Sequence, residues 1–137
     1  MTGKIVCAVD GGETGRRAIP IAAKLARSEG ASLVLVAVDR LVLGTRGGPS
    51  HQFDSDELGK VLDDARATAE GLGATQVETV GLTGYDIAKA ILDYAEGNNA
   101  GHIVVGTGDK NMLTRAALGS VSHDLVVRAH CPVTVAR

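Results

Sequence analysis

Short apolar runs alternate along the chain with longer segments in which apolar residues recur every three or four positions. Near-continuous apolar runs of strand length are typical of strands buried on both faces of a parallel sheet. The runs predict five strands, at residues 4–9, 33–38, 76–80, 103–105 and 133–135. The third run is weaker in apolar content, so we expect it at an edge of the sheet.

The intervening segments carry apolar residues on one face and charged residues on the other, as amphipathic helices do. They predict four helices, at residues 16–27, 56–71, 83–96 and 120–129. Pro20 lies in the first segment, so that helix either kinks there or begins near it. Residues 39–55 hold three glycines and a proline and predict a long loop, which is either mobile or a lid over a ligand.

The alternation of strands and helices predicts parallel pairing through right-handed crossovers, and hence a single doubly wound α/β domain over residues 1–137. Ligands bind such sheets beyond the carboxyl ends of the strands, where the strand order reverses. The candidate site residues therefore follow the strands, in segments 10–15, 38–40, 81–84 and 106–122. Arg40, Arg46 and His51 in the long loop either contact a phosphate or remain solvated.

Charge and composition exclude several classes of partner. The net charge is −2 and aromatic residues make up 2% of the chain, so neither bulk attraction nor a base-stacking surface favours nucleic acid. The longest apolar runs are far shorter than a bilayer span. The first residues show no signal-peptide pattern. We therefore expect a cytoplasmic protein without a membrane partner.

Residues 10–15 nearly spell the dinucleotide fingerprint GxGxxG, but Asp10 stands at the first glycine position, where a carboxylate would repel the pyrophosphate. A P-loop motif is absent from the sequence. A phospho-receiver domain requires an aspartate at the end of the third strand, where this chain has Val80 and Gly81. The sequence therefore disfavours a dinucleotide-binding domain, a P-loop nucleotide hydrolase and a phospho-receiver domain.

The segment after the fourth strand carries the clearest chemistry. Glycines at 106 and 108 allow backbone N–H groups to approach an anion closely. Gly119 and Ser120 then open a helix, whose first N–H groups and positive dipole end favour a phosphate. Ser120 and Ser122 can donate hydroxyl hydrogen bonds to the same oxygens. Alternatively, Ser120 only caps the helix and the glycines only turn the chain.

This segment resembles the signature of the universal stress proteins, Gly-x2-Gly-x9-Gly followed by Ser or Thr after the fourth strand. Gly106, Gly119 and Ser120 occupy three of the four positions at the right spacing. The resemblance extends to residues 9–11, to Val38 and to residues 130–133, and covers essentially the whole chain. It implies the adenine-nucleotide α-hydrolase-like fold, with strand order 3-2-1-4-5. It also implies a homodimer, commonly formed through the last strand, here Val133–Val135.

The resemblance further implies that an adenine nucleotide, ATP or AMP, binds between the ends of the first, second and fourth strands. The residues that it places around the adenosine are Ala8, Val9, Asp10 and Val38. Those that it places around the ribose and phosphates are Gly106, Thr107, Gly108, Asp109, Gly119, Ser120, Val121 and Ser122. Two alternatives stay open: Val38 is only a core residue, and Asp10 only closes an Asx turn.

Asp109 departs from the family signature, because it stands where the second glycine is expected. A carboxylate about 4 Å from one phosphate charge costs roughly 1 kcal/mol in water and about 4 kcal/mol at an effective dielectric of 20. Lys110 and Arg115 lie nearby in the sequence and could offset this repulsion. Alternatively, Asp109 and the phosphates together hold Mg²⁺, a hard cation that prefers oxygen ligands.

Three classes of function remain open. The first is an adenine-nucleotide-binding protein of stress response or signalling, whose ligand state governs contacts with an unidentified protein partner. The second is a dimeric stress-response interaction module that binds no nucleotide. The third is an enzyme such as a slow ATPase, but Asp109 is the sole carboxylate of the glycine loop and no clear general base accompanies it.

Overall fold

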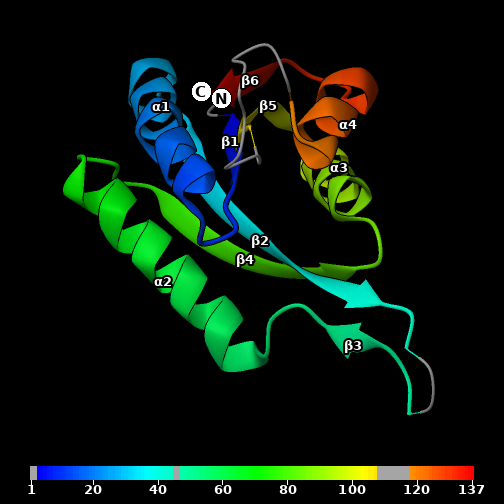
Figure 1. The fold of residues 1–137 in the computed structure, drawn as a ribbon. Helices are drawn as coiled ribbons and strands as arrows, with labels where there is room; N and C mark the ends of the chain where they lie inside the picture. Colours follow the sequence, from blue (N-terminus) through cyan, green and yellow to red (C-terminus); the bar gives the residue numbers. More distant parts are fainter. Residues whose placement is uncertain (1–2, 45–46, 108–117) are drawn as a thin grey trace.

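The computed structural model describes residues 3–44, 47–107 and 118–137, and Figure 1 shows their fold. The strands are β1 Lys4–Ala8, β2 Ser32–Val42, β3 Ser50–His51, β4 Val77–Gly84, β5 Ala100–Gly106 and β6 Val133–Ala136. The helices are α1 Glu13–Glu29, α2 Ser55–Gly71, α3 Ile87–Gly97 and α4 Ser120–Arg128. No helix in these described ranges is long and apolar enough to cross a membrane.

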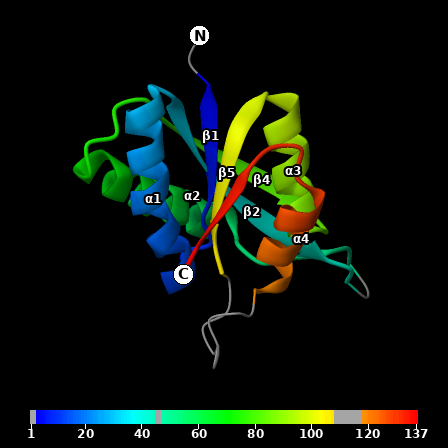
Figure 2. The same ribbon diagram turned by 90° about the horizontal axis from the view of Figure 1, so that it is seen from above.

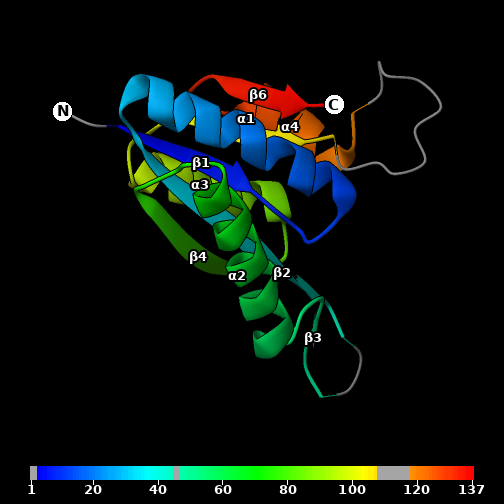
Figure 3. The same cartoon turned by 90° about the vertical axis from the view of Figure 1, so that its left-hand side faces the viewer.

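Five parallel strands form the sheet in the order β4-β2-β1-β5-β6. This is the predicted order 3-2-1-4-5, and the third predicted strand lies at an edge as expected. The remaining strand, β3, was not predicted. It pairs antiparallel with the end of β2 through Leu41–His51 and Val42–Ser50. Figures 1 and 3 show β3 and the end of β2 extending away from the parallel sheet.

Helices α1 and α2 cover one face of the sheet, and α3 and α4 cover the other (Figures 1 and 2). Successive residues of β1 enter opposite cores, as the alternation of a strand requires. Ile5 and Cys7 pack on the α1 and α2 side, whereas Val6 and Ala8 pack on the α3 and α4 side. Burial on both faces explains why the central strands read as unbroken apolar runs.

Two predicted boundaries in the first half of the chain are wrong. The first helix begins at Glu13, and Pro20 lies inside it on the exposed face, where water can serve the carbonyl of Arg16 that loses its usual donor. Residues 39–55 are not a loop throughout, because β2 continues to Val42 and β3 lies within this segment. The turn residues between the two paired segments gave no sign of this pairing.

The third helix also begins later than predicted. Strand β4 continues through Thr83 to Gly84, and α3 starts at Ile87. The carboxylate of Asp86 accepts a hydrogen bond from the backbone N–H of Lys89 at 3.0 Å, and this N-cap fixes the start. The first helix ends at Glu29, and Gly30 caps it in a left-handed conformation with φ of 64°.

Gly106, at the end of β5, allows the first turn of α1 to lie against the sheet. A Cβ at this position would lie 2.1 Å from the carbonyl oxygen of Thr14 and 3.1 Å from the backbone nitrogen of Gly15. Only a residue without a side chain permits this approach. Gly106 therefore places the beginning of α1 beside the carboxyl end of β5.

We expect Gly106→Ala to lower the free energy of unfolding by about 1–3 kcal/mol, the usual cost of overpacking. The obstructing atoms belong to the backbone and cannot rotate away. Gly101→Ala, on the same strand, is the matched control, because a Cβ there meets nothing within 4 Å. Urea unfolding of both variants tests this. Equal stabilities would show that the close approach of α1 is dispensable.

Candidate functional site

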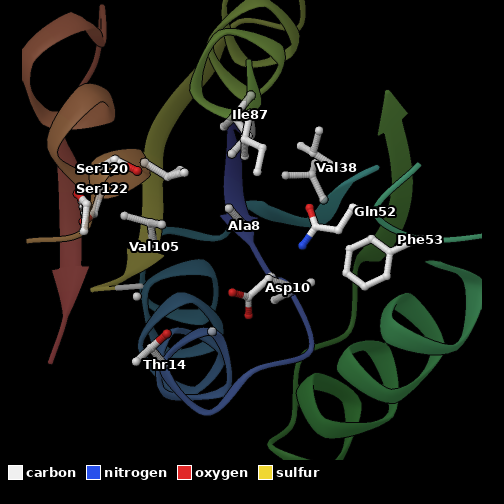
Figure 4. Close-up of a pocket in the computed structure, with 17 residues that line it drawn as sticks. Ala8, Asp10, Thr14, Val38, Gln52, Phe53, Ile87, Val105, Ser120 and Ser122 are labelled. Atoms are coloured by element: carbon white, nitrogen blue, oxygen red, sulfur yellow. Dashed lines mark hydrogen bonds between the residues drawn. The ribbon is translucent and has the colours of Figure 1, made fainter. Parts of the chain in front are cut away.

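A pocket lies at the carboxyl ends of β1, β2 and β5, between the beginnings of α1 and α4 (Figure 4). Its cavity volume is about 150 Å³. The predicted site residues that line it are Ala8, Val9, Asp10, Val38, Gly106, Gly119, Ser120, Val121 and Ser122. Thr107 is buried and does not line the pocket. Gly108 and Asp109 lie outside the described residues, so their predicted roles stay predictions.

One half of the pocket is apolar. Val36 and Val38 from β2 and Ile87 and Ile91 from α3 form its wall, and Phe53 closes its side. Val38 also packs in the core on the α3 and α4 side, so its core and pocket roles coincide. We call these five residues the apolar half of the pocket. Its side chains suit the face of a flat, uncharged ring.

The other half of the pocket ends at the N-terminus of α4. Gly119 is the N-cap residue, and no side chain caps this turn within the described part of the chain. The carbonyl of Gly119 accepts the N–H of His123 at 2.9 Å, which begins the helical hydrogen bonding. The N–H groups of Ser120, Val121 and Ser122 precede the first helical donor. This end of α4 therefore presents backbone donors and a positive dipole to the pocket.

Ser122 differs from its predicted role as a phosphate donor. Its side chain is 1% exposed, and its hydroxyl donates to the carbonyl oxygens of Thr107 and Gly119, each at 3.0 Å. The N–H of Gly119 also donates to the carbonyl of Thr107 at 2.8 Å. Ser122 thus ties the start of α4 to the end of β5, and its single proton is not available to a phosphate. Ser120 is exposed.

Asp10 closes an Asx turn and also lines the pocket, so the two interpretations of this residue do not exclude each other. Its Oδ1 accepts a hydrogen bond from the N–H of Gly12 at 2.8 Å, just before α1. The same oxygen would lie 2.8 Å from a Cβ placed on Gly15. A full negative charge therefore stands at the beginning of α1, where it outweighs the half charge of the helix dipole. Of the two helix ends at the pocket, α4 is the one suited to an anion.

Gln52 and Phe53 line the pocket and were missed by the sequence analysis. They follow β3, in a segment with the composition of a loop and outside the family signature. Figure 4 shows the carboxamide of Gln52 directed toward the cavity. No local pattern marks these two residues. Their backbone is held by residues 12 and 14 positions earlier: the N–H of Gln52 donates to the carbonyl of Arg40, and the N–H of Phe53 donates to the carboxylate of Asp39.

Asp39 holds Phe53 and also contacts His51. It is 7% exposed, and its carboxylate accepts a hydrogen bond from the backbone N–H of Phe53 at 3.1 Å and contacts Nδ1 of His51. The hydrogen bond with His51, aided by the N–H of Phe53, lowers the pKa of Asp39 below its ordinary value. His51 thus contacts Asp39 while its side chain stays 56% exposed. Arg46 lies outside the described residues.

Within residues 3–44, 47–107 and 118–137, no three His, Cys, Asp or Glu side chains form a metal-binding group. The predicted Mg²⁺ contact of Asp109 lies outside these ranges.

Comparison with known proteins identifies the family. The family model for the universal stress protein family matches residues 1–137. Universal stress protein YxiE of Bacillus subtilis is 31% identical over 150 residues, covering 100% of both chains. A universal stress protein of Thermus aquaticus is 34% identical over 136 residues, covering 97% of each. This chain therefore belongs to the universal stress protein family.

The fold comparison agrees. The structure of the universal stress protein from Archaeoglobus fulgidus in complex with dAMP matches with a TM-score of 0.76 and 26% identity, and covers 100% of this chain and 98% of that one. The predicted adenine-nucleotide α-hydrolase-like fold is confirmed.

The lowered pKa of Asp39 predicts a pH-dependent stability. Because the folded pKa lies below the unfolded value near 3.8, the carboxylate stabilises the fold fully above about pH 4. This stabilisation is lost as the pH falls through the folded pKa. Urea unfolding of the wild type and Asp39→Asn should therefore show a difference in stability at pH 6 that shrinks by pH 3.

Asp63→Asn is the control for this measurement, since Asp63 is exposed on α2. A stability difference for Asp39→Asn that stays constant from pH 6 to pH 3 would contradict the assigned contacts of Asp39.

Proposed function

We propose that this universal stress protein binds an adenine nucleotide in the pocket, with the base in the apolar half and the phosphate at the N-terminus of α4. The main support for the proposal is that the apolar half and the uncapped N-terminus of α4 line the same cavity. An apolar wall favours a ring, and uncapped backbone donors favour an anion. A nucleotide joins the two chemistries in a single ligand.

The size of the pocket supports a particular placement. A cavity of about 150 Å³ is smaller than the roughly 300–1,000 Å³ of most ligand pockets. It suits a base held inside while the ribose and phosphates extend toward the mouth. There the exposed carboxylate of Asp10 can accept a hydrogen bond from a ribose hydroxyl. The related Archaeoglobus fulgidus protein in complex with dAMP supports the same ligand class.

We include ATP and AMP in this ligand class. The proposed Mg²⁺ contact of Asp109 lies outside the described residues. We further propose that the bound nucleotide governs contacts with a protein partner in a cytoplasmic stress response. The alternative is an interaction module that acts without a nucleotide.

The edge of the sheet supports a homodimer as part of this proposal. Among the described strands, β6 pairs only with β5, and its Val133 and Val135 are half-buried. An edge strand with free backbone groups is a surface for pairing with another chain. A second copy of this protein would cover both valines.

Ser120→Asp tests the phosphate position. Ser120 is exposed at the first position of α4, where an aspartate is compatible with the helix. Repulsion between unit charges about 4 Å apart is roughly 1 kcal/mol in water and about 4 kcal/mol at an effective dielectric of 20. Calorimetry should therefore show AMP affinity reduced about fivefold or more, the lower bound from that 1 kcal/mol, with adenosine affinity little changed.

Ser120→Asn separates charge from size, and we expect it to weaken AMP binding less than Ser120→Asp does. Equal losses of AMP and adenosine in Ser120→Asp would place the phosphate elsewhere. A wild type that binds neither ligand would favour the interaction module.

A further inference from the structure

Residues 50–54, which we call the arm, carry Gln52 and Phe53 to the pocket. Strand β3 begins the arm, and the beginning of α2 follows it (Figures 1 and 3). Both residues line the cavity from the side opposite α4 (Figure 4). The arm therefore reaches the half of the pocket in which the base is proposed to lie.

Hydrogen bonds fix the backbone of the arm. The N–H of Gln52 donates to the carbonyl of Arg40 at 2.9 Å, and the N–H of Phe53 donates to the carboxylate of Asp39 at 3.1 Å. Two consecutive residues are thus tied to the end of β2. The pocket faces the side chains of a segment whose backbone donors are already satisfied.

The arm is also fixed where it enters α2. The carboxylate of Asp54 accepts the N–H of Glu57 at 2.8 Å, and the carboxylate of Glu57 accepts the N–H of Asp54 at 3.1 Å. This reciprocal pair is a capping box. Gln52 and Phe53 are therefore held between a β-pairing on one side and a capped helix on the other.

Gln52 brings hydrogen-bonding capacity to the apolar half. The neighbours there are Val36, Val38, Ile87 and Ile91, none of which has a polar side chain. A carboxamide donates through its nitrogen and accepts through its oxygen. This pair of groups matches the edge of adenine, which offers an amino donor beside a ring-nitrogen acceptor.

We propose that Gln52 recognises the edge of the base and that Asp39 is the positioning residue that holds Gln52 and Phe53 at the pocket. This inference rests on the proposed function and deepens it. It assigns base selection to a side chain of the arm, with Phe53 against the ring. The contacts of Asp39 with His51 and with the N–H of Phe53 explain why a buried carboxylate lies beside the pocket without facing it.

Gln52→Glu tests the recognition, because it keeps the shape of the side chain and removes its donor. A carboxylate cannot serve the ring-nitrogen acceptor of adenine, but it accepts from the two neighbouring N–H donors of guanine. The wild type should prefer AMP to GMP. In Gln52→Glu the ratio of AMP to GMP affinity should fall about tenfold, within the range for one bidentate base contact.

The ratio isolates the base, because both ligands carry the same ribose and phosphate and feel the same added charge. Ser50→Ala is the control on the arm, since Ser50 is exposed and does not line the pocket. It should keep the wild-type ratio. Calorimetry with AMP and GMP measures all three proteins. An unchanged ratio in Gln52→Glu would overturn the assignment.

The positioning role of Asp39 is tested by rescue. Asp39→Ala removes the acceptor of the Phe53 N–H and should bring the AMP to GMP ratio toward one. Asp39→Asn keeps a carbonyl acceptor and should restore most of the preference. If Asp39→Ala does not fold, His51→Ala removes one of the two contacts and should lower the ratio partway. Equal ratios in Asp39→Ala and Asp39→Asn, or no change in His51→Ala, would contradict this role.

The two proposals fail in different ways. A wild type that binds AMP and prefers it to GMP, with a ratio that Gln52→Glu leaves unchanged, overturns the inference and preserves the proposed function. A wild type that binds AMP and GMP equally also overturns only base selection. A wild type that binds neither nucleotide overturns both proposals.

Discussion

The uncapped first turn of α4, held against the end of β5, is the feature on which the chemistry of the pocket depends. Parallel strands bring their carboxyl ends to one edge, and two helices begin there. Asp10 occupies the beginning of α1 with a negative charge. The hydroxyl of Ser122 bonds main-chain carbonyls and does not cap the helix amides. The site therefore has one end suited to an anion.

The fold is predictable from the sequence to the extent that burial shapes the apolar pattern. Strands buried on both faces must be apolar throughout, so the five parallel strands and their helices could be located. The start of α1 was missed because Pro20 is tolerated on an exposed face. Strand β3 was missed because its pairing with Leu41 and Val42 crosses a segment rich in turn residues.

The pocket residues also fall into those that the sequence could predict and those that it could not. Residues of the family signature, such as Gly119 and Ser120, lie at the pocket because the signature itself encodes a strand, a loop and a helix start. Gln52 and Phe53 were not predictable, since their positions depend on a carbonyl 12 residues earlier and a carboxylate 14 residues earlier, and on no local pattern. Gly106 also has a packing role that the signature does not reveal, the close approach of Thr14.

The position of the phosphate at the N-terminus of α4 is tested by following backbone amide resonances during a titration with AMP, because they report which helix end meets the phosphate. With the phosphate at the beginning of α4, the amides of Ser120, Val121 and Ser122 should shift most, and adenosine should shift them far less. Largest shifts at residues 12–15 of the α1 turn, with the α4 amides unchanged, would place the phosphate at α1 instead.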